Sequence, residues 1–279
     1  MARVDIEGVG IEYEVIGEGP PAVITAGGRF SKSAPGIREL AEILADGGLS
    51  AIVWDRPNCG ASDLCFQGET EARLNAAMLA GLVGHVGRGP ALLIGGSAGA
   101  RISLITAAFH PQAVSKLFLV WISGGPVSLA ALGSGYTTVS ALAAADGGME
   151  MVAALPDWEE QIRLNPGNRA RLLAQDPDAF IETMQRWCAA FFPSPGSPAP
   201  GLTVEDFGRL STPTLVLRSG RSDIFHPRQT SEEVCRLIRG ATLAEPPWGE
   251  REFIERMAAR DFFARWSLMA PQILEFARG

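Results

Sequence analysis

A single serine with small residues on both sides is the first feature of this sequence suited to chemistry. Residues 91–100 read ALLIGGSAGA, so an apolar run stops at Gly95 and Ser97 stands among glycines and alanines. An apolar strand before it and a helical pattern after it predict a sharp strand-to-helix turn. Such a turn lifts the hydroxyl above the sheet, at a helix N-terminus that favours negative charge. Ser97 is therefore the predicted nucleophile, and it needs a group that accepts its proton.

Histidine, the usual proton acceptor for such a serine, is scarce in this chain. It occurs only at His85, His110 and His226. His85 ends a predicted surface helix and His110 stands at a helix end before a proline, so both are interpreted as structural or solvated. His226 lies three residues after Asp223, near a predicted sheet edge, and is kept as an alternative base.

The elements that would position Ser97 alternate between apolar runs and helical patterns. Most of the apolar runs are continuous, which is typical of strands buried on both faces. The predicted strands are 3–7, 11–16, 22–25, 50–54, 91–94, 117–121, 214–217 and 241–244. The predicted helices are 36–45, 69–86, 98–109, 230–239 and 261–276. This alternation predicts an α/β fold with a mostly parallel eight-stranded sheet flanked by helices.

The alternation stops between about residues 126 and 210, where the pattern is helical and contains no strand. A helical insertion between two strands of one sheet predicts a lid over the edge at which open α/β sheets bind ligands. The predicted domains are a core of residues 1–125 and 211–279 and a cap of residues 126–210. Apolar cap side chains are expected to face Ser97, namely Leu132, Met149, Met151, Trp187 and Phe191.

The composition narrows the classes of partner. The net charge of −7 and the pI near 5.1 argue against nucleic acid or an anionic membrane. The start of the chain lacks a signal-peptide pattern, and no apolar stretch is expected to be long enough to span a bilayer. The four cysteines are scattered without metal spacing, so they are interpreted as reduced thiols of a cytoplasmic protein. A small-molecule substrate without cofactor or metal is expected, and the oligomeric state is left open, a homodimer included.

With these motifs in place, the chain resembles the α/β-hydrolase superfamily over nearly its whole length. Residues 95–99 fit the G-x-S-x-G nucleophile elbow of that superfamily. The stretch VITAGGRF at 23–30 stands where the superfamily has a strand followed by an oxyanion-binding turn. The resemblance implies the α/β-hydrolase fold with a helical lid inserted after strand 6. It also implies that the backbone N–H groups of Gly28 and Ala98 hold a developing oxyanion.

The resemblance supplies a catalytic acid but no histidine base. Asp223 follows a buried strand, where the superfamily has its triad aspartate. The loop EPPWGEREF at 245–253, which would carry the superfamily's histidine, contains none. Glu250 lies 27 positions after Asp223, at the spacing expected for that histidine, and is the predicted base. Proximity to Asp223 would raise the pKa of one of the two carboxyl groups, which suits acid–base work.

Two further residues complete the predicted site, and one alternative for Glu250 stays open. Trp248 and Arg29 are expected to belong to the substrate pocket. A salt bridge to an arginine would instead remove Glu250 from the chemistry, with Arg29, Arg101 and Arg251 as candidates.

Three functions remain open at this point. The first is an enzyme that hydrolyses an ester, a lactone or a carbon–carbon bond next to a carbonyl in a small, largely apolar molecule. The second is a cyclase, lyase or decarboxylase on the same fold that uses a carboxylate as acid or base. The third is a catalytically silent ligand-binding protein. Release of product in a burst from an activated ester would favour the first.

Overall fold

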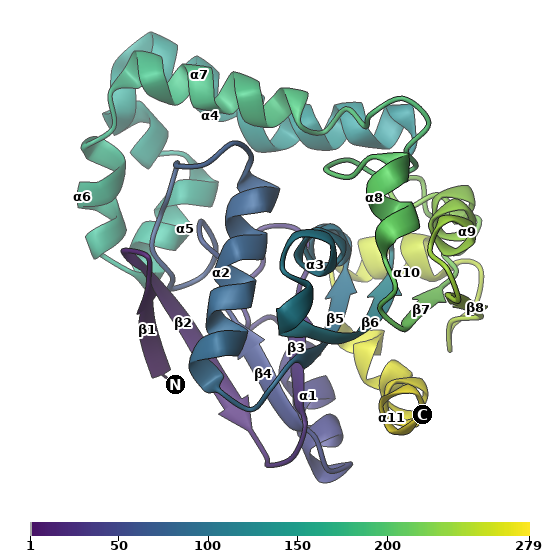
Figure 1. Cartoon of the computed structure of the whole chain (residues 1–279). Coiled ribbons are helices and arrows are strands. Elements are labelled where there is room, and N and C mark those ends of the chain that lie inside the picture. Colours follow the sequence, from purple (N-terminus) through teal and green to yellow (C-terminus); the bar gives the residue numbers. More distant parts are fainter. Residues whose placement is uncertain (1) are drawn as a thin grey trace.

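The apolar runs form one eight-stranded sheet in a computed structural model that describes residues 2–279 (Figure 1). The strands are β1 (Ala2–Ile6), β2 (Val9–Ile16), β3 (Pro21–Thr25), β4 (Ser50–Trp54), β5 (Ala91–Gly96), β6 (Val114–Val120), β7 (Thr214–Leu217) and β8 (Thr242–Ala244). Their order is β1-β2-β4-β3-β5-β6-β7-β8. Only the β1–β2 and β2–β4 pairs are antiparallel. The predicted mostly parallel sheet is therefore confirmed.

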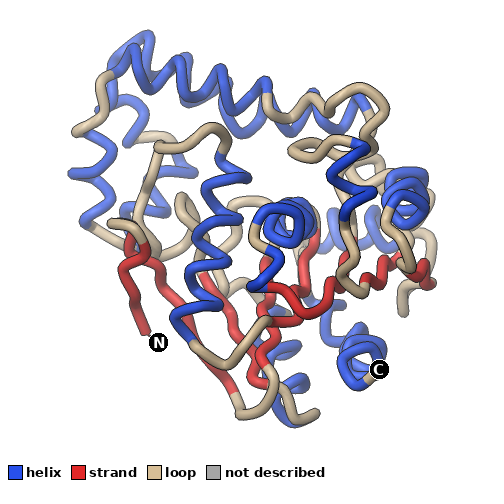
Figure 2. Tube along the Cα trace, in the orientation of Figure 1, coloured by secondary structure: helices blue, strands red, loops and turns tan. Residues whose placement is uncertain are grey.

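Helices cover both faces of this sheet, which explains why its central strands are apolar throughout. Around the sheet the chain forms α1 (Ile37–Asp46), α2 (Glu71–Val86), α3 (Ala98–Phe109), η1 (Pro111–Ala113), α8 (Val204–Arg209), α9 (Arg228–Leu237), α10 (Glu252–Ala259), η2 (Ala264–Met269) and α11 (Ala270–Arg278). Side chains of α2, α3, α8 and α9 share one apolar core with the sheet. Those of α1, η2 and α11 share the core on its other face. Figure 2 shows the strands as a central layer between these helices.

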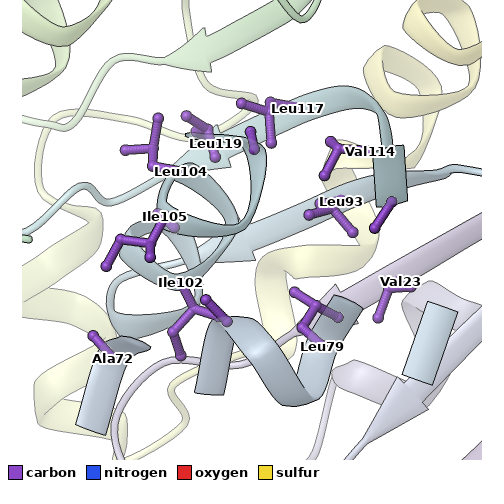
Figure 3. Close-up of a cluster of buried hydrophobic side chains, with 14 of the residues drawn as sticks. Val23, Ala72, Leu79, Leu93, Ile102, Leu104, Ile105, Val114, Leu117 and Leu119 are labelled. Carbon is purple, nitrogen blue, oxygen red and sulfur yellow. The ribbon is translucent and has the colours of Figure 1, made fainter. Parts of the chain in front are cut away.

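The core beneath α2 and α3 holds the helix that follows Ser97 in place. Figure 3 shows Ile102 and Ile105 of α3, Leu79 of α2 and Leu93 of β5 as members of one cluster of buried side chains. These four side chains are fully or almost fully buried. Each such burial contributes on the order of 1.5–3 kcal/mol relative to exposure. Buried side chains on β5 and on α3 thus hold the turn between these two elements in place.

The helical insertion lies between β6 and β7. It contains α4 (Pro126–Ala153), α5 (Pro156–Leu164), α6 (Gly167–Leu173) and α7 (Pro177–Ala189). Helices α4 and α7 run side by side across one end of the molecule (Figure 1). Phe207 of the following α8 already packs in the core of the sheet. The division into a core and a cap at residues 126–210 stays a prediction.

One expectation about the insertion is corrected by the structure. The helical run Pro126–Leu164 has a mean hydropathy of 1.3, so by length and composition alone it could cross a membrane. The run is interrupted at Gly147 and Gly148, whose backbones are not helical. Packing against α7 covers one side of α4, whereas Val127, Val139 and Leu142 stay exposed.

The C-terminal region also differs from its prediction. The segment predicted as one helix over 261–276 begins as the 3₁₀ turn η2, and α11 follows with Pro271 in its first turn. A proline fits the first turn because the N–H that it lacks has no helical acceptor there. Helix α10 was not predicted, and it contributes three side chains to the site described next.

Candidate active site

Ser97 occupies the sharp turn between β5 and α3. Its backbone has φ of 57° and ψ of −118°, a conformation that costs free energy for a residue with a side chain. The neighbours must be glycine, because a Cβ on Gly95 would lie 2.4 Å from the Gly99 carbonyl oxygen and one on Gly99 2.0 Å from that of Thr25. The predicted elbow is thus present in the structure, and it leaves the serine hydroxyl partly exposed above the sheet.

The hydroxyl of Ser97 faces His226. The distance from Ser97 Oγ to His226 Nε2 is 2.9 Å, and His226 Nδ1 lies 2.8 Å from Asp223 Oδ2. Asp223 and His226 are only 4% and 6% exposed. The three side chains form a continuous chain from hydroxyl to imidazole to carboxylate, which is the geometry of a nucleophile, a base and an orienting acid.

The short loop after β7 explains how an acid and a base three residues apart can meet. Asp223 Oδ1 accepts hydrogen bonds from the backbone N–H groups of Phe225 and His226, at 3.1 and 3.0 Å. This turn, closed by an aspartate side chain, folds the backbone back on itself. It points the His226 ring at the second carboxylate oxygen. Pro227 then leads directly into α9.

Helix α10 supplies a cation to the acid. Arg256 Nη2 donates to Asp223 Oδ2 at 2.9 Å, and Arg256 Nε donates to Glu252. The guanidinium lies over the ring of Trp121, at 4.2 Å from its centre. Burial acts to raise the pKa of Asp223, but His226 and Arg256 outweigh it and hold that pKa below its usual value. Asp223 is therefore ionised at neutral pH, as an orienting acid should be.

Glu250 does not lie where the sequence predicted it. Both of its carboxylate oxygens accept from Arg228, and Oε2 also accepts the backbone N–H of Arg221. The side chain is 52% exposed. The bond from Arg228 lowers the pKa of Glu250, against the predicted rise. The expectation that Glu250 stands beside Ser97 and Asp223 is therefore wrong, because the start of α9 brings Arg228 to it, and His226 has the position instead.

An apolar cavity of about 150 Å³ opens at Ser97. Gly27, Gly28 and Trp121 line it beside Ser97 and His226. Helix α4 contributes Leu132 and Tyr136, helix α10 contributes Phe253, Arg256 and Met257, and further walls come from Phe30, Phe225, Phe262 and Phe263. This volume admits a small organic molecule.

The two predicted pocket residues lie outside this cavity. Trp248 packs on Trp121, with ring centres 5.6 Å apart, and borders a separate hollow next to Glu250. Arg29 borders a neighbouring cavity. The expectation for Trp248 is corrected, because its ring packs behind Trp121 and away from the cavity at Ser97. A substrate-binding role for Arg29 stays a prediction.

The apolar cap side chains expected to face Ser97 lie in four different places. Leu132 lines the cavity at Ser97, whereas Phe191 lines the neighbouring cavity. Met149 and Trp187 are buried in the core of the cap itself. Met151 is 42% exposed. One of the five predicted lining residues therefore faces Ser97.

The loop after β3 lies close to the serine. A Cβ on Gly27 would be 2.7 Å from Ser97 Cβ, which puts this backbone against the nucleophile. The buried Arg56 donates to the carbonyl oxygens of Ala26 and Gly28 and holds the loop. Ala98 is the first residue of α3. The oxyanion role of the Gly28 and Ala98 N–H groups stays a prediction.

Metal-ligating side chains do not cluster in the part of the chain that the structure describes. No group of three or more His, Cys, Asp or Glu side chains has the arrangement of a metal site there.

Comparison with known proteins gives a family and several similar folds. A family model described as "Alpha/beta hydrolase family" matches residues 23–269. A 2-hydroxy-6-oxononadienedioate/2-hydroxy-6-oxononatrienedioate hydrolase of Burkholderia vietnamiensis is 32% identical over 123 residues. That match covers 42% of this chain and only 41% of that enzyme.

Solved structures are similar over the whole chain at low identity. The enol-lactonase of Burkholderia xenovorans LB400 has a TM-score of 0.62 at 18% identity, with 100% of both chains covered. A meta-cleavage product hydrolase of Pseudomonas fluorescens IP01 has a TM-score of 0.62 at 19% identity, covering 100% of this chain and 97% of its own. At such identities the likeness shows a shared fold.

Proposed function

The chain belongs to the alpha/beta hydrolase family, and on that premise we propose that it is a serine hydrolase with Ser97, His226 and Asp223 as its catalytic triad. The observation that carries the proposal is the 2.9 Å distance between Ser97 Oγ and His226 Nε2. This distance is within the range over which a general base takes a proton. The buried Asp223 on the other ring nitrogen fixes the imidazole so that Nε2 faces the hydroxyl.

The reaction follows from these positions. The Ser97 oxygen attacks the carbonyl carbon of the substrate while its proton passes to His226 Nε2. The ionised Asp223 stabilises the imidazolium, and the N–H groups of Gly28 and Ala98 receive the oxyanion. His226 then gives its proton to the leaving group, and the acyl group remains on Ser97. A water molecule, deprotonated by His226, releases the acid and restores the serine.

The substrate class follows from the cavity and from the family. An apolar hollow of about 150 Å³ suits a small, largely apolar ester, lactone or ketone whose carbonyl reaches Ser97. The similar proteins include an enol-lactonase and a meta-cleavage product hydrolase, which supports the same range. A reaction centred on a carboxylate base loses its motivation, because Glu250 is bound by Arg228.

Covalent trapping tests the proposal. Wild-type protein mixed with p-nitrophenyl acetate should release a burst of nitrophenol that matches the enzyme concentration, and a fluorophosphonate should label Ser97. Ser97→Ala should lose both signals.

The matched control is Ser123→Ala, because the Ser123 hydroxyl lies 3.4 Å from Ser97 Oγ. Ser123 should not be labelled, and its variant should keep the burst. An absent burst together with an unlabelled Ser97 would contradict the proposal.

A further inference from the structure

A second, smaller cavity adjoins the one at Ser97. Gly28 and Tyr136 line both cavities and form the wall between them. The smaller cavity has a volume of about 20 Å³, and Ala98, the residue after Ser97, borders it. Its remaining walls come from α2, α3, Phe191 and the loops that carry Arg29, Arg56 and Cys59. A molecule bound at Ser97 therefore lies next to a second cavity that is lined by different side chains.

Arginines dominate the charge of this second cavity. Arg29, Arg56 and Arg101 line it, whereas Glu71 is its one carboxylate. Arg56 donates to backbone carbonyl oxygens and to Cys59, so it has no carboxylate partner. The surroundings of the cavity thus carry about two positive charges in excess, within a chain whose net charge is −7.

Arg101 is the cation without a partner. Its Nε is buried, and no hydrogen bond or ion pair joins its guanidinium to any group among residues 2–279. The guanidinium carbon lies 4.3 Å from the centre of the Phe191 ring, so an aromatic face covers one side. Burial lowers the pKa of Arg101, which marks the cost of holding this charge away from water. Arginine nevertheless stays protonated in proteins.

Arg29 leaves a second donor without an acceptor. Nη1 binds Glu71 at 2.9 Å, but Nη2 is buried without a partner, in a side chain that is only 10% exposed. The rings of Tyr136 and Trp158 cover this guanidinium, with centres 5.4 and 4.9 Å from its Cζ. Buried donors are satisfied in the great majority of native proteins. Two guanidinium groups with unsatisfied N–H donors at one cavity therefore call for an anionic acceptor.

We propose that this cavity binds a carboxylate group of the substrate, held by Arg101 and Arg29. The planar fork of a guanidinium matches a carboxylate, and such charge-assisted pairs are strong. The small volume favours the two oxygens of a carboxylate over a larger tetrahedral phosphate. The inference rests on the proposed function, because it takes the acyl carbon to lie at Ser97.

The adjacency of the two cavities favours a short substrate. The backbone N–H of Arg101 donates to the carbonyl oxygen of Ser97 in the first turn of α3, and the cavity at Arg101 also borders Ala98, the residue after Ser97. Because Gly28 and Tyr136 line both cavities, a short spacer of about two or three methylene groups between carboxylate and reacting carbonyl is the length that we propose. The substrate class is therefore an ester, lactone or ketone of a short chain that ends in a carboxylate.

Two activated esters of equal chain length test this specificity. The p-nitrophenyl monoester of glutaric acid carries the carboxylate, and p-nitrophenyl pentanoate has a methyl group in its place. Wild-type protein should prefer the glutarate ester by about tenfold or more in kcat/KM. Arg101→Met should lower kcat/KM for the glutarate ester by about 10–100-fold and change that for the pentanoate ester less than threefold.

Two further variants complete the kinetic test. Arg101→Gln keeps a polar but shorter and uncharged side chain and should behave like Arg101→Met, which guards against a variant that fails to fold. Arg163→Met removes an exposed arginine paired with Glu160 and should leave the preference unchanged. Equal kcat/KM for the two esters in the wild type, or an unchanged preference in both Arg101 variants, would overturn the inference while leaving the hydrolase proposal intact.

A binding measurement separates the two proposals. Ser97→Ala removes the nucleophile, and its calorimetric affinity for glutarate should fall tenfold or more when Arg101→Met is added. That result would support the carboxylate site even in a protein without esterase activity. Equal affinities in the single and double variants would refute the site, whatever the activity of the wild type.

Discussion

The exchange of His226 for glutamine is the most direct test of the triad. Glutamine keeps a side chain of similar reach and can still hydrogen-bond to Asp223, but it cannot take the serine proton at neutral pH. General-base catalysis contributes about 10²–10⁴-fold, and loss of a whole triad function costs about 10⁴-fold or more. We expect kcat for an activated ester to fall by about 10⁴-fold, or roughly 5.5 kcal/mol in activation free energy.

Glu250→Gln is the matched variant for the same experiment. It introduces the same residue, glutamine, and removes the charge of the carboxylate that the sequence predicts as the base. Because Glu250 is exposed and bound to Arg228, kcat should stay within about twofold of the wild type. Stopped-flow release of nitrophenol from p-nitrophenyl acetate measures acylation for both variants. Added imidazole should restore part of the activity in His226→Ala.

The two variants decide the assignment between them. A His226→Gln protein that keeps more than about a tenth of the wild-type rate would refute the role of His226. A loss of more than tenfold in Glu250→Gln would return the base to the loop at 245–253. Circular dichroism and the melting temperature of each variant establish that the fold is retained.

Two other consequences concern stability. The pKa of Asp223 is lowered by folding, so the ionised carboxylate stabilises the fold above about pH 4, and this contribution is lost as the pH falls through the lower folded-state pKa. Urea unfolding should show a stability gap between wild type and Asp223→Asn that narrows below about pH 4, and a gap independent of pH would contradict this. Arg101→Met replaces an unpaired, largely buried cation by an apolar chain and should raise stability by about 1–2 kcal/mol, or about 2–8 °C in melting temperature. Calorimetry measures this change, and a lower melting temperature would mean that Arg101 has a partner in the fold.

Local patterns were enough to predict most of the fold and the nucleophile. Continuous apolar runs such as 91–94 and 214–217 can be read as buried strands because burial on both faces demands them. The glycines around Ser97 can be read as a sharp turn because steric contact there excludes any side chain. Such requirements act over a few residues, so the sequence displays them directly.

The partners of Ser97 depend on directions that residue counting cannot supply. Spacing along the chain favoured Glu250, but the position 27 residues after Asp223 lies on the outside of the loop, where Arg228 binds it. His226 reaches Ser97 across 129 positions of sequence because the turn closed by Asp223 aims its ring at the elbow.

The sequence by itself determined the α/β sheet, the elbow and the place of the acid. These depend on burial and steric fit within short segments. Only the tertiary structure decided that His226 faces the nucleophile and that Arg256 also binds the acid, Asp223. It also decided that Arg101 has no ion-pair partner. Hydrogen bonds and charge pairing act through space, and packing alone sets which distant side chains point toward one another.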